Sequence, residues 1–596
     1  MSNSIIEHGI VLSYRDVFGD YDQISFPELV QGISTETVLR IACYYAGKVY
    51  YQGYSSKPHI KELEHWSQRF PADIQDQLAQ LVESRLQETG KFLFLNRLST
   101  LTFIQKTLCH YEAGPIREEL SPAEDLNLFK AYLYATQVWQ DRQAQTFDNY
   151  PHTGYSYEAV YLTAAIGNEE LKGFKDIRPP FISAIHFFQF CENDDVFSRM
   201  LNVFLTQKGL SDWREYLKNL LSLYLIDGDM QGQFKQTRLV VGGKYESFKE
   251  WLQCLCVDPE SYQPKYDFLE LRENPVFRLG PDDFLVLDPD FVIDKLFQGI
   301  KFDMGTTLMQ NKFELNGRPI KSRDSFFSYL AEHYSERRRF YDLIPFLFSK
   351  DPDAICLSGE QIKPLVQDGE PDYYVRIGKH IFLFEYKDVT LNATVKQSYL
   401  PDKVLEELRN KFVENEKGKP KGIRQLHNTV VAIQSGSFAS VDSGIPDDLE
   451  IYPLIVFTDP CLKVPGVNYF IQRWADQDIN QRQLRDGVKV HPAIMIHMDT
   501  LILHQDRFHN LDILTIQIFR DYLQFLNQRV CVSAQQSLLH PLGFELKIGG
   551  EVRKEDLLIK LVPFDVFLAK RLLAEPPNGL YPAILRDQIG SLFKKS

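Results

Sequence analysis

The first half of the chain has the periodicity of amphipathic helices. In the stretch 59–111, apolar residues recur at three- and four-residue spacings among good helix formers, and this spacing predicts helices. Another helix is expected to begin at Ser121-Pro122, because a capping serine followed by a first-turn proline is a typical helix start. Two more are expected within residues 194–227. The sequence therefore predicts a mainly α-helical regulatory or assembly region over residues 1–270.

From residue 274 onward the pattern alternates between strands and helices. The stretch 274–300 indicates a strand, a Gly-Pro turn, a strand and a helix. A helix at 322–348, a β-hairpin, helices at 401–415 and 423–435, and strands at 450–459 and 491–499 follow. Such alternation favours an α/β domain, which we place at 271–510 including its lead-in hairpin. The region 511–596 is expected to be mainly helical, with a polar hairpin-like break at 545–556.

Charge is distributed unevenly between the two halves. Residues 1–300 hold 28 Lys and Arg against 42 Asp and Glu, whereas residues 301–596 hold 38 of each. The net charge of −14 therefore lies in the first half, which nucleic acid would repel at long range. The second half has no such barrier. Acidity that serves solubility alone is an equally good explanation of this difference.

Several classes of protein are disfavoured by the absence of their signals. No apolar run approaches the roughly 18 residues that span a bilayer, and the start shows no secretory pattern. The eight cysteines are scattered without a C-x-x-C pair, which favours a reducing cytoplasm over a disulfide framework. The sequence also lacks the phosphate-binding loop, the dinucleotide fingerprint, H-E-x-x-H and G-x-S-x-G. We expect a cytoplasmic protein without a membrane partner.

Two strand-like runs at 369–388 carry charges that an ordinary buried hairpin would not need. Gly378-Lys379 suits a two-residue type II′ turn, which has glycine at its first central position. With that turn, the register runs back from the loop and sets Asp372 opposite Glu385. Side chains alternate faces along a strand, so Lys387 shares the face of Glu385. Directly opposed residues have Cβ atoms about 4.5–5.5 Å apart.

A divalent cation is the simplest remedy for two carboxylates held side by side. Like charges at that separation are destabilising, and carboxylate oxygens are the ligands that Mg²⁺ or Mn²⁺ prefers. Lys387 beside such a metal would orient or activate a water and stabilise charge developing on a phosphate. The alternative is a salt-bridged hairpin in which Lys387 pairs with Glu385, and Asp372 caps the backbone or is solvated. That alternative explains each charge singly, but not their shared face.

These residues resemble the motif of the PD-(D/E)XK nuclease superfamily, the restriction-endonuclease-like proteins. The match consists of Pro371-Asp372, twelve residues, and Glu385-Tyr386-Lys387. The similar region covers about 330–460. The resemblance implies a core of a helix, a three-stranded meander, a helix and a further strand.

The resemblance also implies roles for individual residues. Asp372 and Glu385 would bind the metal and Lys387 would serve the attacking water. Many members carry a glutamate on the preceding helix, where Glu332 and Glu336 both qualify and Glu332 is favoured. Some branches carry a glutamine on the following helix, as Gln425 does here, although the tyrosine that often follows it is absent.

The leading hypothesis is therefore a Mg²⁺- or Mn²⁺-dependent nuclease acting on nucleic acid, with DNA preferred over RNA as the substrate. Its helical first half would bind a protein partner or a second copy of the chain. At the level of fold, this architecture resembles restriction or anti-phage defence effectors. Two alternatives remain: a non-catalytic nuclease fold that binds nucleic acid or a partner, and a helical scaffold protein. Eight basic residues after the hairpin suit either a phosphate backbone or a solvated helix face: Lys396, Lys403, Arg409, Lys411, Lys417, Lys419, Lys421 and Arg424.

Overall fold

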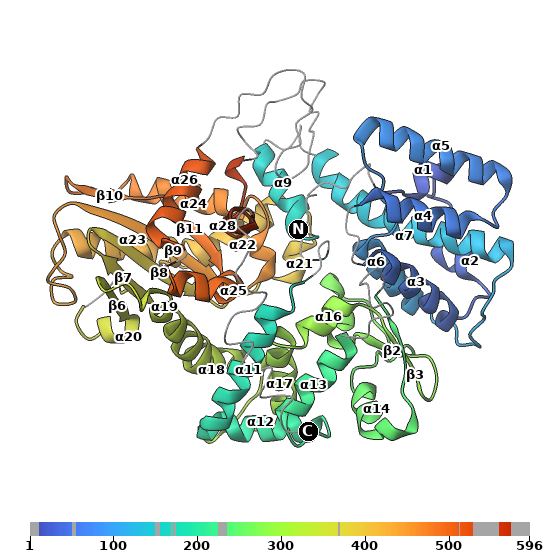
Figure 1. Cartoon of the computed structure of the whole chain (residues 1–596), viewed down its shortest axis with the longest axis horizontal. Helices are drawn as coiled ribbons and strands as arrows, with labels where there is room; N and C mark the ends of the chain where they lie inside the picture. Colours follow the sequence, from blue (N-terminus) through green and yellow to red (C-terminus); the bar gives the residue numbers. More distant parts are fainter. Residues whose placement is uncertain are drawn as a thin grey trace.

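The computed structural model is a mixed α/β protein, with a mainly helical N-terminal half and a six-stranded sheet among helices in its C-terminal region (Figure 1). The structure describes residues 11–50, 55–148, 155–168, 171, 175–224, 235–366, 370–511, 513–527 and 559–573.

The N-terminal half contains the predicted helices. They are α1 (Tyr14–Phe18), α2 (Phe26–Val30), α3 (Thr35–Val49), α4 (Ser56–Ser67), α5 (Ala72–Thr89), α6 (Arg97–Cys109), α7 (Pro122–Asp148), α9 (Tyr157–Ile166), α11 (Arg178–Asn193), α12 (Asp195–Gln207) and α13 (Trp213–Tyr224). Helix α7 begins with proline as expected, and Ser121 and Glu124 bond reciprocally to each other's backbone N–H groups, as in a capping box.

A small antiparallel sheet follows, with the strand, turn, strand and helix that the sequence predicts. Strand β3 lies between β1 and β2. The elements of this segment are β1 (Arg238–Val240), η1 (Gly243–Tyr245), α14 (Glu246–Gln253), η2 (Tyr266–Phe268), α15 (Leu269–Glu273), β2 (Val276–Arg278), β3 (Asp283–Val286), α16 (Pro289–Asp294), α17 (Gln298–Gln310), β4 (Glu314–Leu315) and β5 (Arg318–Pro319).

The large sheet has the order β10-β9-β8-β7-β6, with β11 also paired to β9. Strands β6, β7 and β8 form an antiparallel meander, whereas β9 runs parallel to β8, and β10 and β11 run parallel to β9. Their bounds are β6 (Ala354–Ser358), β7 (Tyr373–Ile377), β8 (His380–Lys387), β9 (Leu449–Phe457), β10 (Val488–Val490) and β11 (Ile494–His497). The apolar run 381–384 is buried, in agreement with a central position for β8.

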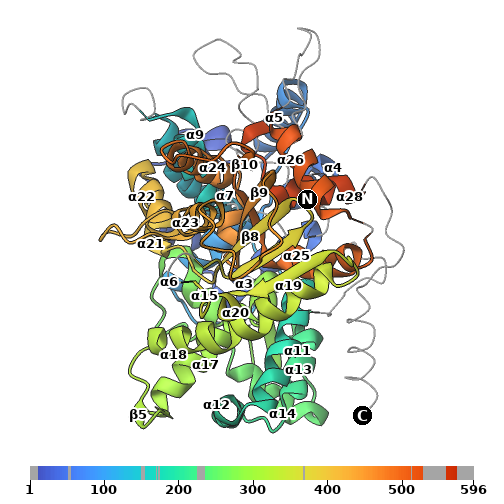
Figure 2. The same ribbon diagram turned by 90° about the vertical axis from the view of Figure 1, so that its left-hand side faces the viewer.

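Helices cover both faces of this sheet (Figure 2). Val375 and Phe382 point into a core shared with α11, α19, α25 and α26, and Tyr374 and Leu383 point into a core shared with α9, α22, α23 and α24. The C-terminal helices are α18 (Arg323–Leu330), the π-helix η3 (Ala331–Phe340), α19 (Tyr341–Phe348), α20 (Gly359–Ile362), α21 (Ala393–Lys396), α22 (Pro401–Phe412), α23 (Gly422–Gln434), η4 (Pro460–Lys463), α24 (Val467–Ile479), α25 (Met498–His509), α26 (Thr515–Leu526) and α28 (Phe564–Leu573).

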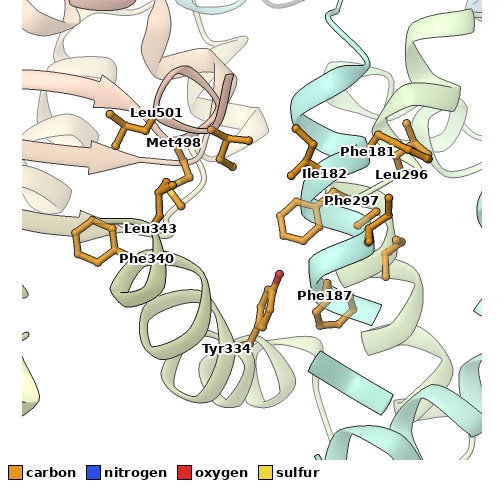
Figure 3. Close-up of a cluster of buried hydrophobic side chains, with 14 of the residues drawn as sticks. Phe181, Ile182, Phe187, Leu296, Phe297, Tyr334, Phe340, Leu343, Met498 and Leu501 are labelled. Atoms are coloured by element: carbon orange, nitrogen blue, oxygen red, sulfur yellow. The ribbon is translucent and has the colours of Figure 1, made fainter. Parts of the chain in front are cut away.

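The buried cores join elements from both halves of the chain. In Figure 3, Phe181 and Phe187 of α11 lie across from Tyr334 of η3 and Met498 of α25, and all four belong to one hydrophobic cluster. Helix α9 contributes Leu162 in the same way to the opposite face of the sheet. The domain boundaries at 270 and 510 stay predictions.

Two further expectations concern parts of the chain that are only partly described. Helices α26 and α28 agree with a helical C-terminal region, while the expected break at 545–556 lies outside the described residues. No helix among those described is long and apolar enough to cross a membrane. The seven cysteines in the described ranges are all free thiols.

Candidate functional site

The hairpin adopts the register that its turn predicts. Gly378 has φ of +56°, as the first central position of a type II′ turn requires, and Ile377 pairs with His380. The same ladder ends with Tyr373 opposite Phe384, so Asp372 directly precedes β7 beside the next residue of β8. The Asp372 carboxylate accepts a hydrogen bond from the backbone N–H of Tyr386 at 2.7 Å. Asp372 is thus fixed against the end of β8.

Glu385, Lys387 and Gln425 meet on one face of that strand end. Glu385 is only 1% exposed, and Lys387 Nζ donates to its Oε1 at 2.5 Å. Lys387 Nζ also donates to Oε1 of Gln425 at 3.2 Å. Gln425 lies in the first turn of α23, which packs against β8. The structure therefore brings together four of the five predicted site residues: Asp372, Glu385, Lys387 and Gln425.

The two carboxyl groups oppose each other's ionisation. Burial, followed by the charge of Glu385, raises the pKa of Asp372 well above its ordinary value. Burial likewise raises the pKa of Glu385, although Lys387 counteracts this. Burial alone would lower the pKa of Lys387, but Glu385 and Asp372 outweigh it and raise that pKa. The lysine is therefore held as a cation next to two acids that are costly to ionise.

One oxygen of Glu385 is left for another partner. Its Oε2 is buried and has no hydrogen-bond partner, and a buried carboxylate oxygen is expensive to leave unsatisfied. A hard divalent cation suits this unpartnered oxygen, because Mg²⁺ is commonly held by one or two carboxylates together with waters and substrate phosphates. The described residues contain no group of three or more His, Cys, Asp or Glu side chains suited to a metal. Within the described ranges, only the two carboxyl groups of Asp372 and Glu385 stand together here, and their role as ligands of Mg²⁺ or Mn²⁺ stays a prediction.

The salt-bridged alternative shares some of these contacts. A purely structural hairpin would also pair Lys387 with Glu385 and let Asp372 cap a backbone N–H, as observed. It does not account for the unpartnered oxygen of Glu385. Nor does it account for a second carboxyl group so close that the first one raises its pKa.

The glutamate on the preceding helix that faces the site is Glu336, not the favoured Glu332. Glu332 is 63% exposed, with His333 4.0 Å away. The charge of Glu336, in contrast, acts on both site carboxyl groups and on the site lysine. Its carboxylate accepts a hydrogen bond from Tyr341 at 2.5 Å. The two glutamates lie on the same face of the helix about one turn apart along its axis, so only one of them can lie near the strand end.

A second buried charge cluster, which the sequence analysis missed, begins at the next residue of the strand end. Lys301 Nζ donates to Asp388 at 3.1 Å, and Thr458 Oγ1 donates to it at 2.8 Å. Burial raises the pKa of Asp388, but Lys301 and these hydrogen bonds outweigh it and lower the pKa to about 2. No local sequence signal could have revealed the pair, because 87 positions separate its partners. This cluster anchors the strand end that carries Lys387.

No family model, curated protein or solved structure matches the chain. Its function is therefore inferred from the site itself.

Proposed function

We propose that the protein is a Mg²⁺- or Mn²⁺-dependent nuclease that hydrolyses phosphodiester bonds, with DNA preferred over RNA as its substrate. The observation that carries the proposal is the buried, unpartnered Oε2 of Glu385, set beside Asp372 with Lys387 on the same face. The element order adds support. A helix, the antiparallel meander β6-β7-β8, three helices and the parallel strand β9 resemble the core of the PD-(D/E)XK superfamily.

The chemistry follows from what each side chain offers. Asp372 and Glu385 supply the oxygen ligands of the metal. When bound, the metal polarises a phosphate oxygen and lowers the pKa of a coordinated water. Lys387 holds its positive charge next to the reacting phosphate and stabilises the negative charge that develops there. Gln425 accepts a hydrogen bond from Lys387 and so keeps the ammonium group on this face.

The proposal is tested by incubating the full chain with plasmid, single-stranded DNA and RNA, each with Mg²⁺, with Mn²⁺ and with EDTA. Wild type is expected to cut at least one substrate in a metal-dependent manner, and Lys387→Ala and Glu385→Gln are expected to lose the activity. The matched control is Lys379→Ala, since Lys379 is an exposed lysine of the same hairpin that pairs with Asp448 and Glu450, and it should retain full activity.

The result that overturns the proposal is equally plain. If wild type and Lys387→Ala process every substrate at the same rate, the site does not catalyse hydrolysis. The same domain would then be a binding module for nucleic acid or a protein, or part of a scaffold.

A further inference from the structure

The structure separates the basic residues that follow β8 into two groups. Four of the eight are engaged inside the protein: Lys396 pairs with Asp267, Arg409 with Glu414, Lys411 with Glu407, and Arg424 with Glu414 and Asp478. In the part of the chain that the structure describes, the other four have no carboxylate within ion-pair distance. One of these, Lys403, is exposed on α22. The remaining three are Lys417, Lys419 and Lys421, which lie between α22 and α23.

Residues 415–421, which we call the basic turn, connect α22 with α23 and carry three lysines and one acid, Glu416. The Asn415 side chain accepts hydrogen bonds from the backbone N–H groups of Lys417 at 3.1 Å and Lys419 at 2.9 Å. The backbone N–H of Asn415 donates to the carbonyl of Lys419 at 3.0 Å, and that of Lys421 to Val413 at 2.8 Å. Lys417 and Lys419 are exposed. The turn thus presents its lysines to solvent on a fixed backbone rather than on a loose loop.

The basic turn leads directly into the candidate site. Lys421 immediately precedes α23, whose first-turn Gln425 lies 3.2 Å from Lys387 Nζ. The pKa of Lys421 is lowered, first by burial and then by the neighbouring charges of Lys387 and Lys419. Lys421 is therefore close enough to Lys387 and Lys419 to be repelled by both, although Glu385 counteracts part of this repulsion. A polyanion would relieve that repulsion.

We infer that the basic turn binds the sugar-phosphate backbone of nucleic acid next to the bond that is cut. This inference rests on the proposed function and adds the surface along which the substrate lies. Lysine ammonium groups are compact point charges, and contacts with phosphates carry no base information. Binding through the turn is therefore independent of nucleotide sequence. The acidic first half of the chain, which carries the net charge of −14, repels phosphates and does not extend this binding surface.

The test measures binding without cleavage. Fluorescence anisotropy with labelled DNA of about 20 nucleotides, single-stranded and duplex, is recorded in EDTA from about 50 to 200 mM salt. The double variant Lys417→Ala/Lys419→Ala is compared with Lys57→Ala/Lys61→Ala. The control removes the same charge from two exposed lysines of α4, which belongs to the group of helices at the other side of the molecule (Figure 1).

Each lysine that contacts a phosphate contributes about 1 to the slope of log K against log salt concentration. The turn variant should therefore lower the magnitude of the slope by about 2 and weaken binding several-fold at the low-salt end. The control variant should match wild type in both quantities. Both variants should unfold at the wild-type temperature, because the substituted lysines are exposed.

The outcomes distinguish this inference from the proposed function. Equal slopes for the turn variant and wild type, or no binding by wild type at low salt, overturn the inference even when wild type cuts DNA. A reduced slope for the turn variant alone supports the inference even when no substrate is cut, and in that case it is the catalytic proposal that fails.

Discussion

Replacing Asp372 with asparagine should make the metal-free protein more stable while abolishing its response to metal. In the metal-free state, Asp372 lies next to the buried Glu385, and burial and that charge raise its pKa. Asparagine keeps an oxygen that accepts the hydrogen bond from Tyr386. It also replaces the other charged oxygen with an N–H donor, next to a glutamate whose Oε2 has no hydrogen-bond partner. The substitution therefore removes a repulsion and retains the contact.

The magnitude follows from the geometry of the strand pair. Neighbouring carboxylates about 5 Å apart repel by about 3 kcal/mol at an effective dielectric constant of about 20. Lys387 offsets part of this, so we expect a gain of about 1–2 kcal/mol at about pH 8. Because the folded-state pKa is raised, the wild-type penalty is absent below the unfolded-state value near 4 and grows as pH rises through the folded-state pKa. The advantage of the variant should therefore fade toward about pH 4.

The assay is urea unfolding of wild type and Asp372→Asn at about pH 5 and pH 8, with EDTA and with Mg²⁺. Mg²⁺ should stabilise wild type at the higher pH, where the carboxyl groups ionise, and leave the variant unchanged. Asp442→Asn is the control, because Asp442 is another buried aspartate but is satisfied by Arg376 and Tyr374, so its loss should destabilise. A variant that is less stable than wild type in EDTA at pH 8, or equally stabilised by Mg²⁺, would refute the reasoning.

Three further predictions concern the support of the site. Lys301→Met leaves Asp388 without the ammonium group at 3.1 Å, and should lower the free energy of unfolding by about 3–5 kcal/mol, measured by urea unfolding at neutral pH. Because the wild-type pKa of Asp388 is about 2, the difference in stability between wild type and variant should shrink as pH falls toward that value. Gly422→Ala would set a Cβ 2.6 Å from the backbone oxygen of Phe412. The resulting shift of α23 should lower the cleavage rate strongly and the urea midpoint of unfolding only slightly. Gln425→Ala should lower the cleavage rate without changing Mg²⁺ affinity measured by calorimetry, and a changed affinity would contradict its role at the site lysine.

The hairpin could be predicted because its causes are local. A glycine that must adopt positive φ at Gly378 sets the turn, the turn sets the register, and the two-residue alternation of a strand assigns each side chain to a face. These rules place Asp372, Glu385 and Lys387 together before any tertiary contact is known. The central position of β8 was predictable for a similar reason, since its run is apolar on both faces.

The remaining features depend on long-range contacts. Strand β6 could not be located from its residues, because Ala354–Ser358 is half-buried throughout and shows no alternation. Glu332 and Glu336 lie on the same face of their helix one turn apart, and only the packing of that helix against the sheet shows that Glu336 is the one near the site. Lys301 and Asp388 are 87 positions apart, so their pairing produces no periodic pattern in the sequence.

The placement of α9 and α11 on opposite faces of the large sheet has a consequence for how the chain acquires its site. Tyr161 of α9 packs in the same core as Ile381, and Phe187 of α11 in the same core as Phe382. A fragment beginning at residue 271 would expose to water the apolar side chains of both cores that α9 and α11 cover, and should aggregate. During synthesis, the helical half is complete before the sheet emerges, and it can act as a template on which the strands assemble.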